Sequence, residues 1–156
     1  MLAAVTVGVL FRGKGPTRVT EKPAGTGAIP PFGKALTAAV SKAVSSTVTV
    51  CGYVVLFGAL LGVLEPYLAL PPTTNALVCG FLELGSGVAA MAGQTLGPVS
   101  LAVTALIIGW GGVSVHCQTM GVLAGTDISC ARHLAGRALC GVLAAVYTYL
   151  GARMLF

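Results

Sequence analysis

Charged residues make up only 8% of the 156 residues, whereas a soluble domain carries about 25%. Hydrophobic residues make up 56%, the mean hydropathy is +0.93, and residues 43 to 131 contain no Lys or Arg. This composition excludes an ordinary water-soluble domain, because such a long uncharged stretch is typical of chains that face lipid. We expect an all-α, polytopic integral membrane protein with transmembrane helices and re-entrant or broken helices.

The net charge of +5 does not indicate a nucleic-acid partner, because most of it comes from one Gly/Pro-rich stretch and not from a folded basic face. That stretch and the residues just after it contain Arg12, Lys14, Arg18, Lys22, Lys34 and Lys42. The five cysteines have no CxxC spacing and lie in apolar surroundings, which predicts small core residues. We expect no metal site and no cofactor.

The first elements in chain order are a short apolar segment and a basic linker. Residues 1–11 would extend only about 16 Å as a helix, half of a hydrocarbon core of about 30 Å. They predict a partial transmembrane helix. Either the chain is a fragment of a longer transporter, or the start of the chain is placed too late in the sequence. Residues 12–33 are rich in Gly, Pro and basic residues, and predict a cytoplasmic linker. Residues 34–156 then form the membrane domain.

The membrane domain is expected to begin with a short interfacial helix over 34–45, followed by a transmembrane span over 46–64 that Glu65-Pro66 ends. Basic residues precede this span and none follows it, which predicts that it runs from inside to outside. The last span is predicted over 134–149, where tyrosines suit the headgroup level. If its Arg132 end is cytoplasmic, the chain crosses the membrane once between Asn75 and Asp127.

Glycines interrupt both apolar segments in that interval, which is typical of broken membrane helices. We predict that 76–96 is a re-entrant hairpin with its tip near Gly85-Ser86-Gly87. The span over 99–124 is then unwound between Gly109 and Gly112, with Gly111 inside the break. The converse assignment, in which the first segment crosses and the second turns back, satisfies the same topology.

Glu83 is the first candidate site residue, because a carboxylate in an apolar membrane segment costs several kcal/mol unless it is protonated, paired or bound to a cation. It would bind a solute, a coupling proton or a sodium ion at the helix break, with Ser86 beside it. The alternative interpretations are a neutral or capped glutamate that only fixes helix packing, and a residue at the membrane interface. Asp127 is predicted to cap the last helix, and Trp110 to be a packing residue.

The second group of candidates lies in GWGGVSVHCQTMG at 109–121. On a regular helix Ser114 and Gln118 share a face, while His116 points away from both. In a locally extended segment all three would line one side, and would offer a hydroxyl, an imidazole and an amide to a polar solute. The alternative for His116 is a hydrogen bond between helices.

The blocks GFLELGSG at 80–87 and GWGGVSVHCQ at 109–118 together resemble the C-terminal half of the YlbJ (SpoVV) sporulation integral membrane proteins, within the nucleoside-recognition or Gate domain group. The resemblance extends from about Pro31 to Phe156. It implies a transporter that moves dipicolinic acid across the outer forespore membrane, and it places the four polar candidates Glu83, Ser114, His116 and Gln118 on family motif positions. Leu84-Gly85-Ser86 departs from the more polar stretch expected there.

The sequence therefore predicts a membrane transport protein, or the C-terminal half of one, in the bacterial cell membrane or the outer forespore membrane. Its partners would be a small-molecule solute, a coupling proton or sodium ion, and the bilayer. Alternatives are a nucleoside-type or ion-coupled transporter, and a non-transporting membrane scaffold. An enzyme ranks last, because HExxH and GxSxG motifs are absent. The oligomeric state is not predicted.

Overall fold

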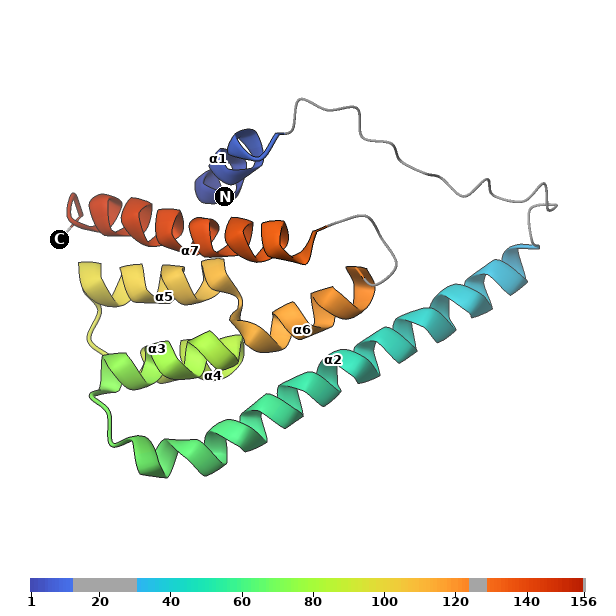
Figure 1. The fold of residues 1–156 in the computed structure, drawn as a ribbon, viewed down its shortest axis with the longest axis horizontal. Helices are drawn as coiled ribbons and strands as arrows, with labels where there is room; N and C mark the ends of the chain where they lie inside the picture. Colours follow the sequence, from blue (N-terminus) through green and yellow to red (C-terminus); the bar gives the residue numbers. More distant parts are fainter. Residues whose placement is uncertain (13–30, 124–128, 156) are drawn as a thin grey trace.

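A computed structural model of the chain describes residues 1–12, 31–123 and 129–155, and this part is entirely helical, without a β-strand. Figure 1 shows its helices in chain order. They are α1 (Leu2–Leu10), α2 (Phe32–Leu68), α3 (Pro72–Leu82), α4 (Leu84–Ala92), α5 (Pro98–Trp110), α6 (Gly112–Leu123) and α7 (Cys130–Ala152). The prediction of an all-α architecture is confirmed.

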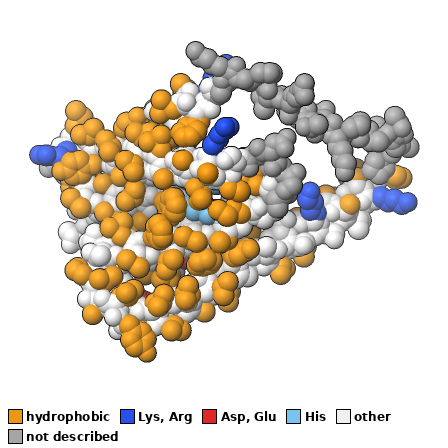
Figure 2. All heavy atoms as spheres, viewed as in Figure 1, with side chains coloured by type: hydrophobic (Ala, Val, Ile, Leu, Met, Phe, Trp, Pro, Cys, Tyr) orange, Lys and Arg blue, Asp and Glu red, His pale blue; other side chains and the backbone are white. Residues whose placement is uncertain are grey.

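Three helical segments in the described part are long and apolar enough to cross a membrane: α2, the α5–α6 pair over Pro98–Leu123, and α7. Many large apolar side chains on these helices are exposed, and orange apolar atoms gather over the left and central part of the face shown in Figure 2. Water would not stabilise such a surface, whereas lipid tails would cover it. The fold is that of a polytopic α-helical membrane protein.

α2 differs from its prediction in both its start and its end. The segments expected over 34–45 and 46–64 form one helix of 37 residues, because no Gly or Pro separates them. The helix also continues through Pro66 to Leu68 and ends at Ala69, which has a left-handed φ of 37°. Pro66 lies in the last turn, so it removes one hydrogen bond but cannot shorten the helix much.

The terminal helices pack against each other. α1 lies on α7, and the Thr6 hydroxyl is 3.4 Å from the Tyr147 hydroxyl. α7 begins earlier and ends later than the predicted span, so Arg132 lies inside the helix and not before it. Most of the predicted 12–33 linker, and the predicted cap Asp127, lie outside the described residues.

α3 and α4 form the predicted hairpin. The Thr73 hydroxyl donates to Oε1 of Gln94 at 2.8 Å across its open end, and a Cβ at Gly87 would overlap the Gly80 backbone on the opposite arm. The arms have 11 and 9 residues, too short to cross a core of about 30 Å at 1.5 Å per residue. The hairpin therefore turns back, and of the two open assignments the structure favours the first segment as the re-entrant one, over Pro72–Ala92 and not 76–96.

The interior of the fold lies where this hairpin meets α5. Ala76, Met91 and Ile107 form the buried apolar cluster there. α5 in turn packs closely along α7, since a Cβ at Gly109 would be 2.5 Å from the Gly141 Cα. Gly109 is thus a close-packing residue inside α5, and its prediction as a helix-break glycine is wrong.

Candidate functional site

The hairpin turns at Glu83, which is the single residue between α3 and α4 and has an extended backbone with φ −139° and ψ 120°. The turn lies two residues before the tip that was predicted near Gly85-Ser86-Gly87, and these three residues lie inside α4. Gly85 is in its first turn, and Gly87 is the close contact between the hairpin arms. Gly87 therefore allows the arms to pack, Gly85 lies against the Glu83 carboxylate, and Glu83 makes the turn.

Glu83 caps the N-terminus of α4 with its own side chain. Its Oε1 accepts from the Gly85 N–H at 2.8 Å, and its Oε2 accepts from the Ser86 N–H at 2.6 Å and the Ser86 hydroxyl at 2.8 Å. The side chain is buried, with 7% exposed. These bonds satisfy N–H groups that a helix N-terminus leaves free, and they place a negative charge at the positive end of the helix.

The second break lies between α5 and α6. Gly111 and Gly112 have φ values of 91° and 80°, a left-handed conformation that costs a residue with a Cβ about 1–2 kcal/mol. Two consecutive residues of this kind end α5 and redirect the chain into α6, as Figure 1 shows. The predicted break is therefore present at Gly111 and Gly112, although it does not extend back to Gly109.

The two breaks meet. A Cβ at Gly112 would be 2.9 Å from the Leu84 backbone nitrogen and 3.3 Å from the Glu83 Cα. α3 has 11 residues and α5 has 13, so the breaks lie about 16 and 20 Å along helices that start at the same end of the fold. In a core about 30 Å thick, the breaks would lie about one half and two thirds of the way across.

Two side chains satisfy the carbonyl groups that these breaks leave free. The Trp110 indole N–H donates to the Phe81 carbonyl oxygen at 3.1 Å, near the end of α3. The Arg137 guanidinium donates from Nε to the Trp110 carbonyl at 3.2 Å and from Nη2 to the Ile108 carbonyl at 3.4 Å. The sequence analysis predicted neither role: it assigned Trp110 to packing and gave Arg137 no role. The signal available was its position inside the last apolar helix, where a cation needs polar partners.

The predicted row of Ser114, His116 and Gln118 does not form. α6 is a regular helix from Gly112 onward, so the extended alternative is wrong and the helical one holds. Gln118 donates to the Ser114 hydroxyl at 3.4 Å, one turn away on the same face. His116 lies on the other side of α6.

His116 is buried, with 2% exposed, and neither of its ring nitrogens has a hydrogen-bond partner among the described residues. Its ring contacts the Trp110 ring edge to face at 4.3 Å between centroids, and the His133 ring lies 5.7 Å away. A neutral imidazole has one donor and one acceptor. A buried donor or acceptor without a hydrogen bond costs about 1–3 kcal/mol of stability, and His116 has one of each. The prediction that His116 bonds to a neighbouring helix has no support in these contacts.

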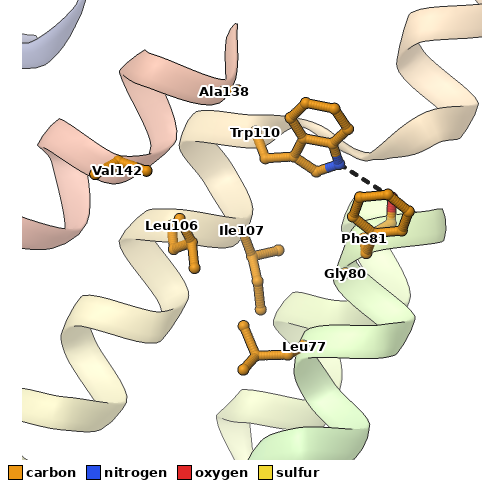
Figure 3. A pocket seen from close by; sticks show the side chains of 8 residues that line it. All are labelled: Leu77, Gly80, Phe81, Leu106, Ile107, Trp110, Ala138 and Val142. Atoms are coloured by element: carbon orange, nitrogen blue, oxygen red, sulfur yellow. Dashed lines mark hydrogen bonds between the residues drawn. The ribbon is translucent and has the colours of Figure 1, made fainter. Parts of the chain in front are cut away.

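Gln118 also lines a groove of about 320 Å³ between α2 and α6. The polar residues in its lining are Ser45, Ser46, Thr49, Tyr53 and Gln118. A second groove, of about 390 Å³ between α3, α5 and α7, is apolar apart from the indole N–H. Figure 3 shows this second groove, with the Phe81 and Trp110 rings stacked at 5.4 Å. Of these two, only the α2–α6 groove offers hydrogen bonds to a polar molecule.

The fold and site define a class: an α-helical membrane protein in which a re-entrant hairpin meets a broken transmembrane helix. No protein-family model, curated protein or solved structure matches the chain. The resemblance to the sporulation membrane proteins therefore stays a prediction that rests on the two sequence blocks.

Proposed function

We propose that the chain is a membrane transport protein, or part of one, and that it moves a small polar solute past the contact between the hairpin tip and the α5–α6 break. The observation that carries this proposal is the contact of Gly112 with the backbone at Glu83 and Leu84. Irregular backbone at membrane depth is tolerated where it is buried in protein or lines a cavity, and transporters place solute sites at such discontinuous helices.

The polar groove between α2 and α6 supplies the path in this proposal. Gln118 lines the groove and bonds to Ser114, which is 1% exposed. Ser114 lies two residues after Gly112, at the start of α6. A solute that exchanges bonds with Gln118 and then with Ser114 would therefore move from the groove toward the break.

The solute is a small molecule with several hydrogen-bonding groups. The lining of the α2–α6 groove contains no charged side chain, which favours a neutral solute such as a nucleoside. Dipicolinic acid is the solute that the sporulation resemblance implies, and the N-terminus of α6 at the break is the feature that would favour its carboxylates, because Glu83 already caps α4. An assay that compares the uptake of these two solutes therefore identifies which of them the protein transports.

The test is transport by the purified full chain in liposomes. Vesicles loaded with terbium report dipicolinate uptake by luminescence, and a labelled nucleoside is measured in parallel. We expect one of the two solutes to enter faster than in protein-free vesicles. Gln118→Leu should lower the initial rate about tenfold, the effect of losing roughly 1.4 kcal/mol of hydrogen bonding.

Thr119→Val is the matched control, because the Thr119 hydroxyl bonds to the Val115 carbonyl at 2.9 Å within α6 and does not line the groove. Its rate should stay within about twofold. Uptake of neither solute above protein-free vesicles, or an equal loss of rate in both variants, would overturn the proposal.

One observation favours a second candidate, a non-transporting membrane scaffold. The Glu83 carboxylate already accepts three hydrogen bonds from its own hairpin, so it needs no solute or ion to be stable. In a scaffold the close glycine contacts would serve helix packing alone. The absence of uptake, with a correctly folded chain in the vesicles, would select this alternative.

A further inference from the structure

A groove of about 420 Å³ between α1 and α7 has a basic lining that the transport proposal does not use. α1 contributes Ala4, Val7, Gly8 and Phe11, and α7 contributes Arg132, His133, Gly136, Arg137 and Cys140. Three of these side chains can carry positive charge, and no Asp or Glu is among the described residues that line the groove. None of the three has an ion-pair partner among residues 1–12, 31–123 and 129–155.

From this groove we infer that the chain binds the phosphate of an anionic phospholipid headgroup between α1 and α7. Arg137 shows the unmet bonding most clearly. A guanidinium has five N–H donors, and Arg137 uses two of them on the Trp110 and Ile108 carbonyls. Three donors remain, and a phosphate can accept two parallel N–H bonds from one arginine.

His133 and Arg132 add donors at the same place. Arg132 is exposed and His133 is partly buried. Neither side chain forms a hydrogen bond with another described residue. Gly136 leaves space beside them, because a Cβ there would meet only Val7 Cγ1, at 3.8 Å. The groove therefore has both cationic groups and room for a headgroup.

The position of the groove favours a lipid over a dissolved anion. Arg132 and His133 lie in the first turn of α7, a membrane-spanning helix, which is the depth of phospholipid headgroups. The α1 side of the groove is apolar, and α1 exposes Val5 and Val9 beyond it. A molecule with a phosphate and an acyl chain matches such a mixed lining, whereas a soluble anion gains nothing from its apolar half.

The experiment measures lipid binding to the purified full chain by native mass spectrometry. Phosphatidylglycerol tests an anionic headgroup, phosphatidylcholine a zwitterionic one, and glycerol phosphate the same phosphate without acyl chains. We expect phosphatidylglycerol to bind at least about tenfold more tightly than the other two. Equal binding of phosphatidylcholine would overturn the inference, and equal binding of glycerol phosphate would assign the groove to a soluble anion.

The variants separate this groove from general charge attraction. Arg132→Gln should weaken phosphatidylglycerol binding about fivefold, the value of one cation near a headgroup. Arg153→Gln removes the same charge at the opposite end of α7 and should change binding less than about twofold. Gly136→Leu fills the groove without a charge change and should weaken binding at least about tenfold. Equal effects of the two arginine variants, or no effect of Gly136→Leu, would overturn the inference.

Discussion

Gly112 lies directly against Glu83: a Cβ on the glycine would be 3.3 Å from the Glu83 Cα and 3.2 Å from the Leu82 carbonyl oxygen. The first residue of α6 therefore touches the tip of the α3–α4 hairpin, where no side chain fits between them. Any displacement of α6 relative to the hairpin must change this contact. The two breaks consequently form one structural unit, although they lie about 30 residues apart in the sequence.

This contact predicts a large effect of Gly112→Ala. The new methyl group meets the Leu84 nitrogen at 2.9 Å, and the residue keeps a φ of 80° that alanine disfavours. We expect the free energy of unfolding to fall by about 2 kcal/mol or more, from backbone strain and displacement of the hairpin. Unfolding of the purified chain in mixed micelles by SDS measures this quantity.

Gly121→Ala is the control in the same helix. Gly121 has an ordinary helical φ and no atom within 4 Å of an added Cβ. Alanine there should stabilise the chain by up to about 1 kcal/mol through helix propensity. Similar stabilities for the two variants would mean that α6 does not rest on the hairpin tip.

Glu83→Gln tests the cap of α4. The amide keeps one oxygen acceptor, but its NH₂ group would face the Gly85 N–H or the Ser86 N–H and hydroxyl, which are the present donors. Opposed donors in a buried site cost about 1–3 kcal/mol, and we expect the free energy of unfolding to fall by that amount. The same micelle titration measures it.

Glu65→Gln is the matched substitution at an exposed glutamate. Glu65 Oε1 accepts from the Asn75 amide at 2.7 Å, and a glutamine oxygen can accept the same bond. Its effect should be below about 0.5 kcal/mol. A loss for Glu65→Gln as large as that for Glu83→Gln would show that charge, and not the helix cap, determines the result.

Composition and glycine spacing predicted the helical class, the hairpin over 76–96 and the break at Gly111–Gly112, because apolar length and backbone freedom are local properties. The position of the hairpin tip was missed. Glycine frees the backbone either to turn or to approach another helix, and only the fold shows that Gly87 and Gly109 do the second. Sequence alone does not distinguish these two uses.

The site was predicted less well than the fold. The polar character of Ser114, His116 and Gln118 was visible in the sequence. Whether the three side chains share a face depends on whether the backbone unwinds after Gly112, and the sequence does not determine this. Arg137 reaches the break from a helix 27 residues away in the sequence. Such a long-range contact leaves no periodic pattern in the sequence for helix or strand rules to detect.

Trp110→Phe should weaken the junction between α3 and α5. Phenylalanine can keep the stacking on Phe81, whose ring is 5.4 Å away, but it loses the indole bond to the Phe81 carbonyl. We expect a loss of about 1 kcal/mol in the free energy of unfolding. Because Trp110 is the single tryptophan, unfolding is followed by circular dichroism. Tyr67→Phe, at a tyrosine that is 84% exposed, should change stability by less than about 0.5 kcal/mol.

His116→Leu separates a structural histidine from one retained for function. Both ring nitrogens are buried without partners among the described residues, so an apolar side chain of similar size removes two unmet bonds. We expect the free energy of unfolding to rise by about 1 kcal/mol or more, while solute uptake into liposomes falls. A residue that costs stability and supports activity is the pattern expected at functional sites.

Met120→Leu, one turn further along α6, exchanges one apolar side chain for another. It should leave both stability and uptake nearly unchanged. A drop in stability for His116→Leu beyond that of Met120→Leu would show that the imidazole has a bonding partner in the folded chain, such as a buried water molecule. Unchanged uptake with raised stability would show that His116, a candidate from the sequence, takes no part in transport, and would leave the proposed path along Gln118 and Ser114 unaffected.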